Sequence, residues 1–120
     1  MAEKSRLRRS LSRWASSSET EARELRRDTR NTGDVSIGDA PDRQPVTVQG
    51  VVRTITLRPR GGVPALEAEL YDGSDVLTVI WLGRRQIAGI GPGRAMRLTG
   101  RIGGATDERI MYNPRYELLP

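Results

Sequence analysis

The stretch VTVQGVV at residues 46–52 and the stretch MRLTGRI at residues 96–102 share one pattern, in which every second residue is apolar or glycine. Successive side chains of a strand point to opposite faces, so this alternation is typical of a half-buried strand. Between them lie two more runs, residues 65–71 and 75–82, separated by the turn Asp72-Gly73-Ser74. An Asp-Gly pair between apolar runs favours a hairpin, because glycine accepts the positive φ that the turn requires.

These runs, with one more strand before Tyr116, predict five strands in a short segment. This pattern predicts an all-β domain over residues 46–120, a five-stranded Greek-key barrel of the OB-fold type. Gly50 and Gly100 are expected at bends where a small barrel closes. We also expect a short helical segment from Arg84 to about Ala88, closing one end of the barrel.

The alternation also assigns faces to the two strands of the hairpin. Core positions expected from it are Leu66, Ala68, Leu70, Leu77, Val79 and Trp81. Outward positions are Glu67, Glu69, Tyr71, Thr78 and Ile80. A bulge before Trp81 would reverse the direction of that side chain, so its orientation stays open at this point.

Several segments of this region resemble a known family. VQGVV at residues 48–52, YDGS at 71–74, VIW at 79–81 and LTGRI at 98–102 resemble the framework of bacterial nucleic-acid-binding OB domains. MYNPRYE at residues 111–117 is similar to the end of the wedge domain of branch-migrating DNA helicases, and the chain also resembles small stand-alone OB proteins of actinobacteria. The resemblance does not extend to the first 45 residues. It implies binding of DNA or RNA, with repair or recombination as the setting.

Composition excludes several classes of function. The chain has no cysteine and no histidine, which excludes disulfides, thiolate or imidazole metal sites and Ser-His or Cys-His nucleophiles. Its only lysine is Lys4, so no Walker-type phosphate loop of a helicase motor is present. No apolar run is long enough for a membrane span or a secretory signal, and we expect a soluble, cytoplasmic protein.

Catalysis and cofactors are not expected. The carboxylate pairs nearest in sequence are Glu67 with Glu69 and Asp72 with Asp75. Glu67 and Glu69 are typical of an outward-facing strand surface, and Asp72 is better explained as a turn residue than as a metal ligand. The formal net charge of +5 is carried almost entirely by arginine, and a basic chain favours a polyanionic partner.

Residues 1–45 differ in composition from the strand region. Residues 1–30 are a basic, charged leader, helical or partly disordered, and residues 31–45 are a linker containing Gly, Pro and Asp. Ser18 and Glu21 have capping-box spacing, which predicts a helix over about residues 19–30. Glu19 and Arg23 then form a pair one turn apart, and a weaker helical tendency covers about residues 4–15.

The leader supports several interpretations. Its early cations could form a basic arm that lies along phosphates: Lys4, Arg6, Arg8, Arg9 and Arg13. The apolar residues Leu7, Leu11 and Trp14 would suit a membrane-surface helix, and the Arg- and Ser-rich start resembles an organellar transit peptide. A solvated tail, or a helix that docks on the barrel or on a protein partner, is the remaining alternative.

The candidate contacts to nucleic acid are arginines and tyrosines at the rim and on the outward face: Arg53, Arg58, Arg60, Tyr71, Arg97, Arg109, Tyr112 and Arg115. Arginine grips phosphate bidentately, and tyrosine offers a ring on which a base stacks. Glu67 and Glu69 would repel phosphates unless arginines neutralise them, a role expected of Arg53. Aromatic residues are few, so we expect backbone contacts to single-stranded or branched substrates rather than tight sequence-specific binding.

The alternative is a protein-interaction module. In that interpretation Glu67, Glu69, Thr78 and Ile80 form a mixed docking surface, and the leader helix folds on contact with the partner. A fold of this type does not by itself specify its ligand. Substitution of Ile80 would then reduce partner binding more than substitution of the rim arginines.

Overall fold

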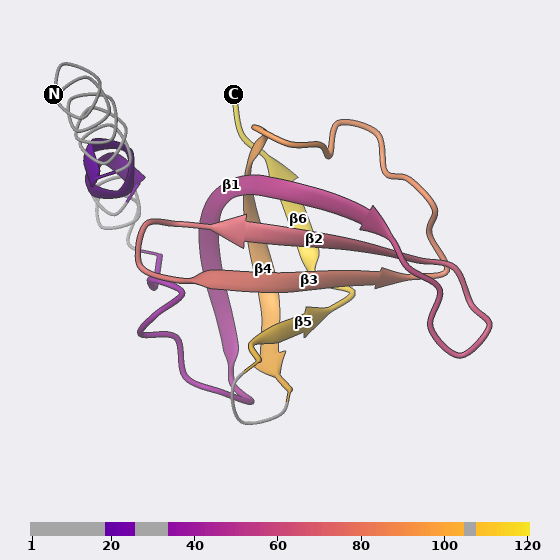
Figure 1. Cartoon of the computed structure of the whole chain (residues 1–120). Helices are drawn as coiled ribbons and strands as arrows, with labels where there is room; N and C mark the ends of the chain where they lie inside the picture. The colour runs from indigo at the N-terminus through magenta and orange to yellow at the C-terminus, as the bar shows by residue number, and fades with distance from the viewer. Residues whose placement is uncertain (1–18, 26–33, 105–107) are drawn as a thin grey trace, which may run out of the picture.

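The computed structural model describes residues 19–25, 34–104 and 108–120 (Figure 1). Within these ranges the chain forms a short helical segment over residues 19–25 and six strands. The strands are β1 (Pro45–Leu57), β2 (Ala65–Tyr71), β3 (Val76–Leu82), β4 (Ala95–Gly103), β5 (Ile110–Tyr112) and β6 (Arg115–Leu118). Their order in the sheet is β1-β2-β3-β5-β4-β6, and a β1–β4 pairing closes five of them into a ring. The expected mostly β architecture is confirmed.

Strand β1 belongs to both halves of this closed sheet. Its first half pairs with β4, and its second half pairs with β2 from Val51 onward, with a bulge between Val52 and Thr54. Gly50 lies where β1 passes from one partner to the other, and a Cβ there would stand 2.6 Å from the carbonyl oxygen of Tyr71. Glycine therefore permits the close approach of two backbones that this crossing needs. Gly100 instead leaves room for Met111, whose sulfur would lie 3.0 Å from an added Cβ.

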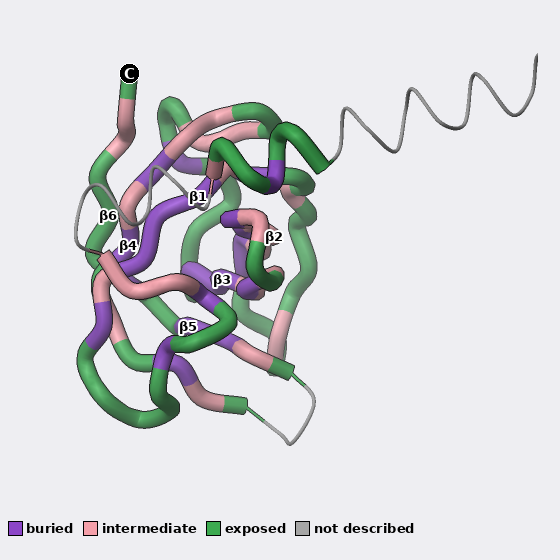
Figure 2. The backbone as a smooth tube through the Cα atoms, turned by 90° about the vertical axis from the view of Figure 1, so that its left-hand side faces the viewer, coloured by how far each residue is buried: buried purple, intermediate pink, exposed green. Residues whose placement is uncertain are grey.

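The interior of the ring is a single apolar core (Figure 2). All six hairpin residues that alternation assigned to the core are buried in it: Leu66, Ala68, Leu70, Leu77, Val79 and Trp81. Trp81 points inward, so the alternative of a reversing bulge does not apply. The rings of Trp81 and Tyr116 form a T-shaped pair, with a centroid separation of 6.0 Å and an interplanar angle of 83°.

The expectation that Ile80 is exposed is wrong, because its side chain has an exposed fraction of 0%. Ile80 does lie on the opposite face of β3 from the core, where it forms a second buried cluster with Ala65 and Ile110. The register explains this, since β5 runs parallel beside β3 and places Tyr112 next to Ile80, while β2 places Glu67 on the other side. Neighbours on both sides cover the outer face of β3.

The short helix expected from Arg84 to about Ala88 is also absent. Residues 83–94 connect β3 to β4 through two turns, closed by the Ile90 amide donating to the Ile87 carbonyl and the Arg94 amide donating to the Gly91 carbonyl. The sequence GIGPGR at residues 89–94 disfavours helix, because glycine and proline are the poorest helix formers. Ile87 nevertheless packs into the main core.

Residues 34–44 form neither helix nor strand, yet they pack closely against the sheet. Ile37 and Ala40 are buried in the main core. The buried carboxylate of Asp72 accepts a hydrogen bond from the Ile37 amide at 2.7 Å and three more from Ser74 and Asp75 in its own turn. Asp72 therefore stabilises its hairpin turn, as expected, and also anchors this segment.

The helical segment over residues 19–25 lies beside the same hairpin turn (Figure 1). A Cβ added at Gly73 would stand 2.2 Å from the carbonyl oxygen of Ala22, so the two backbones are in contact. Glu19 and Arg23 form the expected pair, at 4.0 Å. The remainder of the expected leader helix and the helical tendency over residues 4–15 lie outside the described residues. The described ranges hold no helix with the length and hydropathy needed to cross a membrane.

Candidate functional site

The strand register arranges the outward side chains in rows across the sheet. One row runs through Thr56, Glu67, Ile80 and Tyr112, on four neighbouring strands. The next row runs through Thr54, Glu69, Thr78, Ile110 and Gly103. Because β5 lies between β3 and β4, the second row extends from the hairpin to the end of β4, whereas the first row ends on β5.

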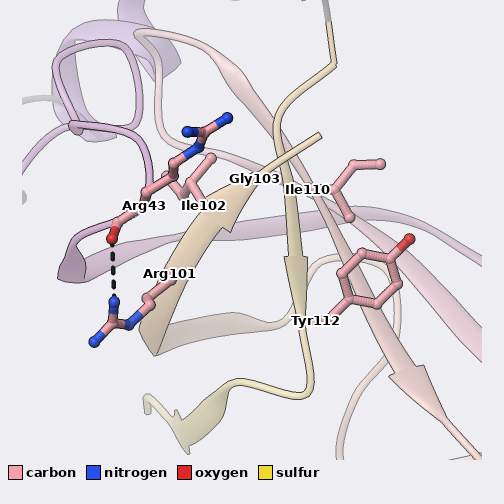
Figure 3. A pocket seen from close by; sticks show the side chains of 6 residues that line it. All are labelled: Arg43, Arg101, Ile102, Gly103, Ile110 and Tyr112. Carbon is pink, nitrogen blue, oxygen red and sulfur yellow. Dashed lines mark hydrogen bonds between the residues drawn. The ribbon is translucent and has the colours of Figure 1, made fainter. Parts of the chain in front are cut away.

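An open hollow of about 440 Å³ lies where the second row meets the end of β4 (Figure 3). Its lining, here called the Tyr112 hollow, consists of Arg43, Arg101, Ile102, Gly103, Ile110 and Tyr112. In Figure 3 the two arginines lie on one side of the hollow and Ile110 and Tyr112 on the other. Tyr112 is 49% exposed, so one face of a flat ring is open to a ligand.

Arg43 holds an unusual backbone conformation at the edge of this hollow. Its φ is +63°, a value that costs a non-glycine residue about 1–2 kcal/mol. The Arg43 amide donates to the carbonyl of Ile102 at 2.9 Å, and the Arg43 carbonyl accepts from the Arg101 guanidinium at 3.2 Å. Glycine or asparagine would suit this position better for stability alone. A strained arginine beside an open hollow therefore points to a role for its side chain.

The two arginines of the hollow retain their capacity to bind an anion. Both residues are exposed, and neither has an ion-pair partner among the described residues. Arg115 on β6 is also exposed without an ion pair in these ranges, and it lies opposite Thr99 of β4, two residues from Arg101. Arg43 and Arg101 thus line the hollow across from the exposed Tyr112 ring, and Arg115 lies on the neighbouring strand β6.

Arg53, Arg58, Arg60 and Tyr71 lie on the hairpin side of the sheet. The guanidinium of Arg53 stands over the Tyr71 ring, 5.3 Å from its centroid, so the expectation that Arg53 neutralises the carboxylates is wrong. Arg58 and Arg60 neutralise Glu67 instead, with nitrogens 3.7 and 3.6 Å from its carboxylate, and Glu69 has no ion pair among the described residues. Arg53 occupies the bulge of β1 and has no residue opposite it on β2, which explains the difference.

Arg97 lies among acidic and amide side chains. It donates to Asp34 at 2.8 Å, to Glu117 at 3.0 Å and to Gln49 at 3.4 Å. The hydrogen bond that Arg97 donates to Asp34, together with the charges of Asp34 and Glu117, raises the pKa of Arg97 above its ordinary value. All of its nitrogens therefore have partners within the chain.

Arg109 lies against residues 34–44. Its guanidinium donates to the carbonyls of Ile37 and Ala40, and one nitrogen lies 3.4 Å from the Asp42 carboxylate. Arg97 and Arg109 thus tie this segment to the sheet from two sides. Of the predicted contact residues, Tyr112 lines the Tyr112 hollow, and Arg115 lies exposed on β6 beside β4.

Sequence reasoning missed Arg43 and Arg101 as members of the site. The alternation of β4 already placed Arg101 on the outward face, so that signal was present. Arg43 carries no local signal, since only the contact between residues 34–44 and the end of β4 brings it to the hollow. No protein family and no curated protein matches this sequence.

Proposed function

We propose that the chain is a non-catalytic nucleic-acid-binding protein that contacts the phosphate backbone of DNA or RNA through arginines. The observation that carries this proposal is the Tyr112 hollow, where an exposed ring lies beside Arg43 and Arg101. An unpaired guanidinium binds a phosphate bidentately, and an exposed tyrosine ring stacks on a base. The guanidinium and the ring can therefore bind the phosphate and the base of a nucleotide.

The strand arrangement supports an OB-fold as the framework of this proposal. Five strands close in the order β1-β2-β3-β5-β4, with β5 parallel to β3. A five-stranded Greek-key barrel of the OB type binds oligonucleotides on the outer face of its second and third strands and at the adjoining loops. In this chain Glu67 already engages the arginines of the loop after β1, so the favoured surface lies towards β4 and β5.

Single-stranded or branched nucleic acid suits this surface better than a continuous duplex. A base reaches the Tyr112 ring only when it is unstacked, and bases of single strands are free to do so. The resemblance to a helicase wedge domain makes forked DNA a substrate to compare, and repair or recombination the corresponding process.

The test is fluorescence anisotropy with labelled single-stranded DNA, single-stranded RNA, duplex DNA and forked DNA, each at two salt concentrations. Tyr112→Leu removes the ring and should weaken single-strand binding by about 5- to 150-fold, which corresponds to about 1–3 kcal/mol of stacking. Arg101→Gln should lower the slope of log K against log salt concentration by about 0.7, the value for one phosphate contact on a single strand.

Arg85→Gln is the matched control for the charge change. Arg85 is exposed, has no ion pair in the described ranges and lies outside the Tyr112 hollow. This variant should bind within about twofold of the unmodified chain, because a distant surface charge is screened by salt. Absence of binding to all four nucleic acids at low salt would refute the proposed function.

A protein-interaction module is the second candidate, favoured by exposed apolar residues on the hairpin side. Leu57, Val63 and Leu82 are 52%, 44% and 42% exposed. The buried Ile80 no longer discriminates between the two functions, since its substitution would damage packing. The substitutions Leu57→Ser and Leu82→Ser therefore replace the Ile80 substitution as tests. If both variants bind nucleic acid with unchanged affinity, these two side chains do not contact nucleic acid, and they contact a different partner or none.

A further inference from the structure

The connection between β3 and β4 has an unbalanced positive charge. Residues 83–94 contain Arg84, Arg85 and Arg94 and no acidic residue. None of these arginines has an ion pair within the described part of the chain. The end of this connection surrounds a second open hollow of about 440 Å³, here called the glycine hollow, which is lined by Gly89, Ile90, Gly91, Pro92, Gly93 and Arg94.

The backbone of the glycine hollow is held open by its two turns. Gly89 and Gly93 have φ values of +84° and +88°, which glycine adopts at little cost. The Gly93 amide donates to the Val52 carbonyl and the Val52 amide to the Arg94 carbonyl, which fixes the second turn to β1. In the described part of the chain the amide of Gly91 donates to no acceptor, so it remains available to a ligand.

Arg94 adds a charged side chain with an unsatisfied donor. Its Nε is inaccessible to solvent and has no hydrogen-bond partner among the described residues. Because Nε is shielded, the donors that an oxyanion in the hollow can reach are the two terminal nitrogens of the Arg94 guanidinium. At Gly91 and Gly93 nothing stands within 4 Å of an added Cβ, so an anion can approach the backbone directly.

We propose that the glycine hollow binds a phosphate group, held by the Gly91 amide and the Arg94 guanidinium. Backbone amides of glycine-rich turns and a guanidinium are the donors that phosphate oxygens bind in proteins. The phosphate comes either from a nucleic-acid backbone or from a free phosphate. The lining of the glycine hollow ends at Arg94, just before β4, and the Tyr112 hollow includes Arg101, Ile102 and Gly103 at the other end of that nine-residue strand, so the two sites share no residue. The inference therefore does not rest on the proposed function.

The test is a titration of the full ¹⁵N-labelled chain with sodium phosphate, followed by amide NMR, with sodium chloride at equal ionic strength as the reference. We expect a saturable shift of the Gly91 amide with phosphate only. Arg94→Gln should weaken phosphate binding by about tenfold, the effect of losing one charge-assisted contact. Arg85→Gln, which removes the same charge from outside the hollow, should leave the affinity within about twofold.

Gly91→Ala provides a second variant that leaves the fold intact. The φ of Gly91 lies outside the left-handed region, and no atom stands within 4 Å of the new methyl group. The variant is therefore expected to fold like the unmodified chain, while the methyl group shields the amide of residue 91. We expect weaker phosphate binding in this variant as well. Equal shifts with phosphate and chloride, or unchanged affinity in both Arg94→Gln and Gly91→Ala, would overturn the proposal.

A final arm identifies the source of the phosphate. After saturation is established, a short oligothymidylate is added in place of phosphate. A shift of the Gly91 amide by both probes supports a nucleic-acid backbone as the ligand. A shift by inorganic phosphate alone supports a free phosphate, whether or not the oligonucleotide perturbs Tyr112.

Discussion

Replacement of Arg43 by glycine tests two properties of this residue separately. One is the free energy that its strained backbone costs, and the other is the contribution of its side chain to nucleic-acid binding. The φ of +63° costs arginine about 1–2 kcal/mol, which Arg43→Gly recovers. Glycine loses more backbone entropy on folding, which costs about 0.5–1 kcal/mol. Both hydrogen bonds of residue 43, to the Ile102 carbonyl and from the Arg101 guanidinium, use backbone atoms and remain. The free energy of unfolding should therefore stay equal or rise by up to about 1.5 kcal/mol.

The same variant should weaken nucleic-acid binding. Loss of one phosphate contact lowers the slope of log K against log salt concentration by about 0.7 on single strands. Loss of about 1 kcal/mol of charge-assisted bonding reduces the affinity by about fivefold. Urea unfolding followed by circular dichroism measures the first effect, and anisotropy titrations at several salt concentrations measure the second.

Arg43→Lys is the matched control, because it retains both the charge and the strained φ. It should keep the stability of the unmodified chain and most of the salt dependence. A loss of stability above about 2 kcal/mol in Arg43→Gly would refute the reasoning about strain. An unchanged affinity and salt slope in Arg43→Gly would refute a phosphate contact at this position.

Three further substitutions test the framework of the site. Asp72→Asn should lower the free energy of unfolding by about 1–3 kcal/mol in urea denaturation, since one amide oxygen cannot accept from both Ile37 and the turn. Gly50→Ala should destabilise by about 1–3 kcal/mol by the same measurement, because its Cβ would overlap the Tyr71 carbonyl; wild-type stability would contradict the close approach. Arg97→Gln should speed amide exchange of residues 34–44 while leaving β2 and β3 protected; uniform exchange rates would show that Arg97 does not hold this segment.

Local patterns were sufficient for β1 to β4 and for the direction of the side chains in the hairpin, whereas the sixth strand, β6, was not predicted. Alternation assigned Leu66 to Trp81 to the correct faces because each assignment depends only on the pleat of a strand. The Asp72-Gly73 pair marked the hairpin because the turn requires a residue that accepts positive φ. These signals lie within a few residues of the structure that they predict.

The errors concern contacts between segments far apart in the sequence. Ile80 is buried because β5 lies beside β3, an adjacency that no local pattern encodes. Arg97 and Arg109 meet partners at residues 34–42, which a Gly- and Pro-containing composition does not reveal. The expected helix near residue 84 is absent, because the turns at Gly89 and Gly93 follow it closely.

The packing of residues 34–44 determines where the chain can be shortened. A truncation that begins at β1 removes Ile37 and Ala40 from the core and exposes the apolar surface that they cover. It also leaves the carboxylate of Asp72 and the guanidinium of Arg109 without their partners in this segment. The smallest fragment that folds on its own is therefore expected to start at or before Asp34, eleven residues ahead of the first strand. A protease that cleaves within residues 34–44 would release the strand region in a weakened form, and ligand affinities measured on such a fragment would describe a different surface.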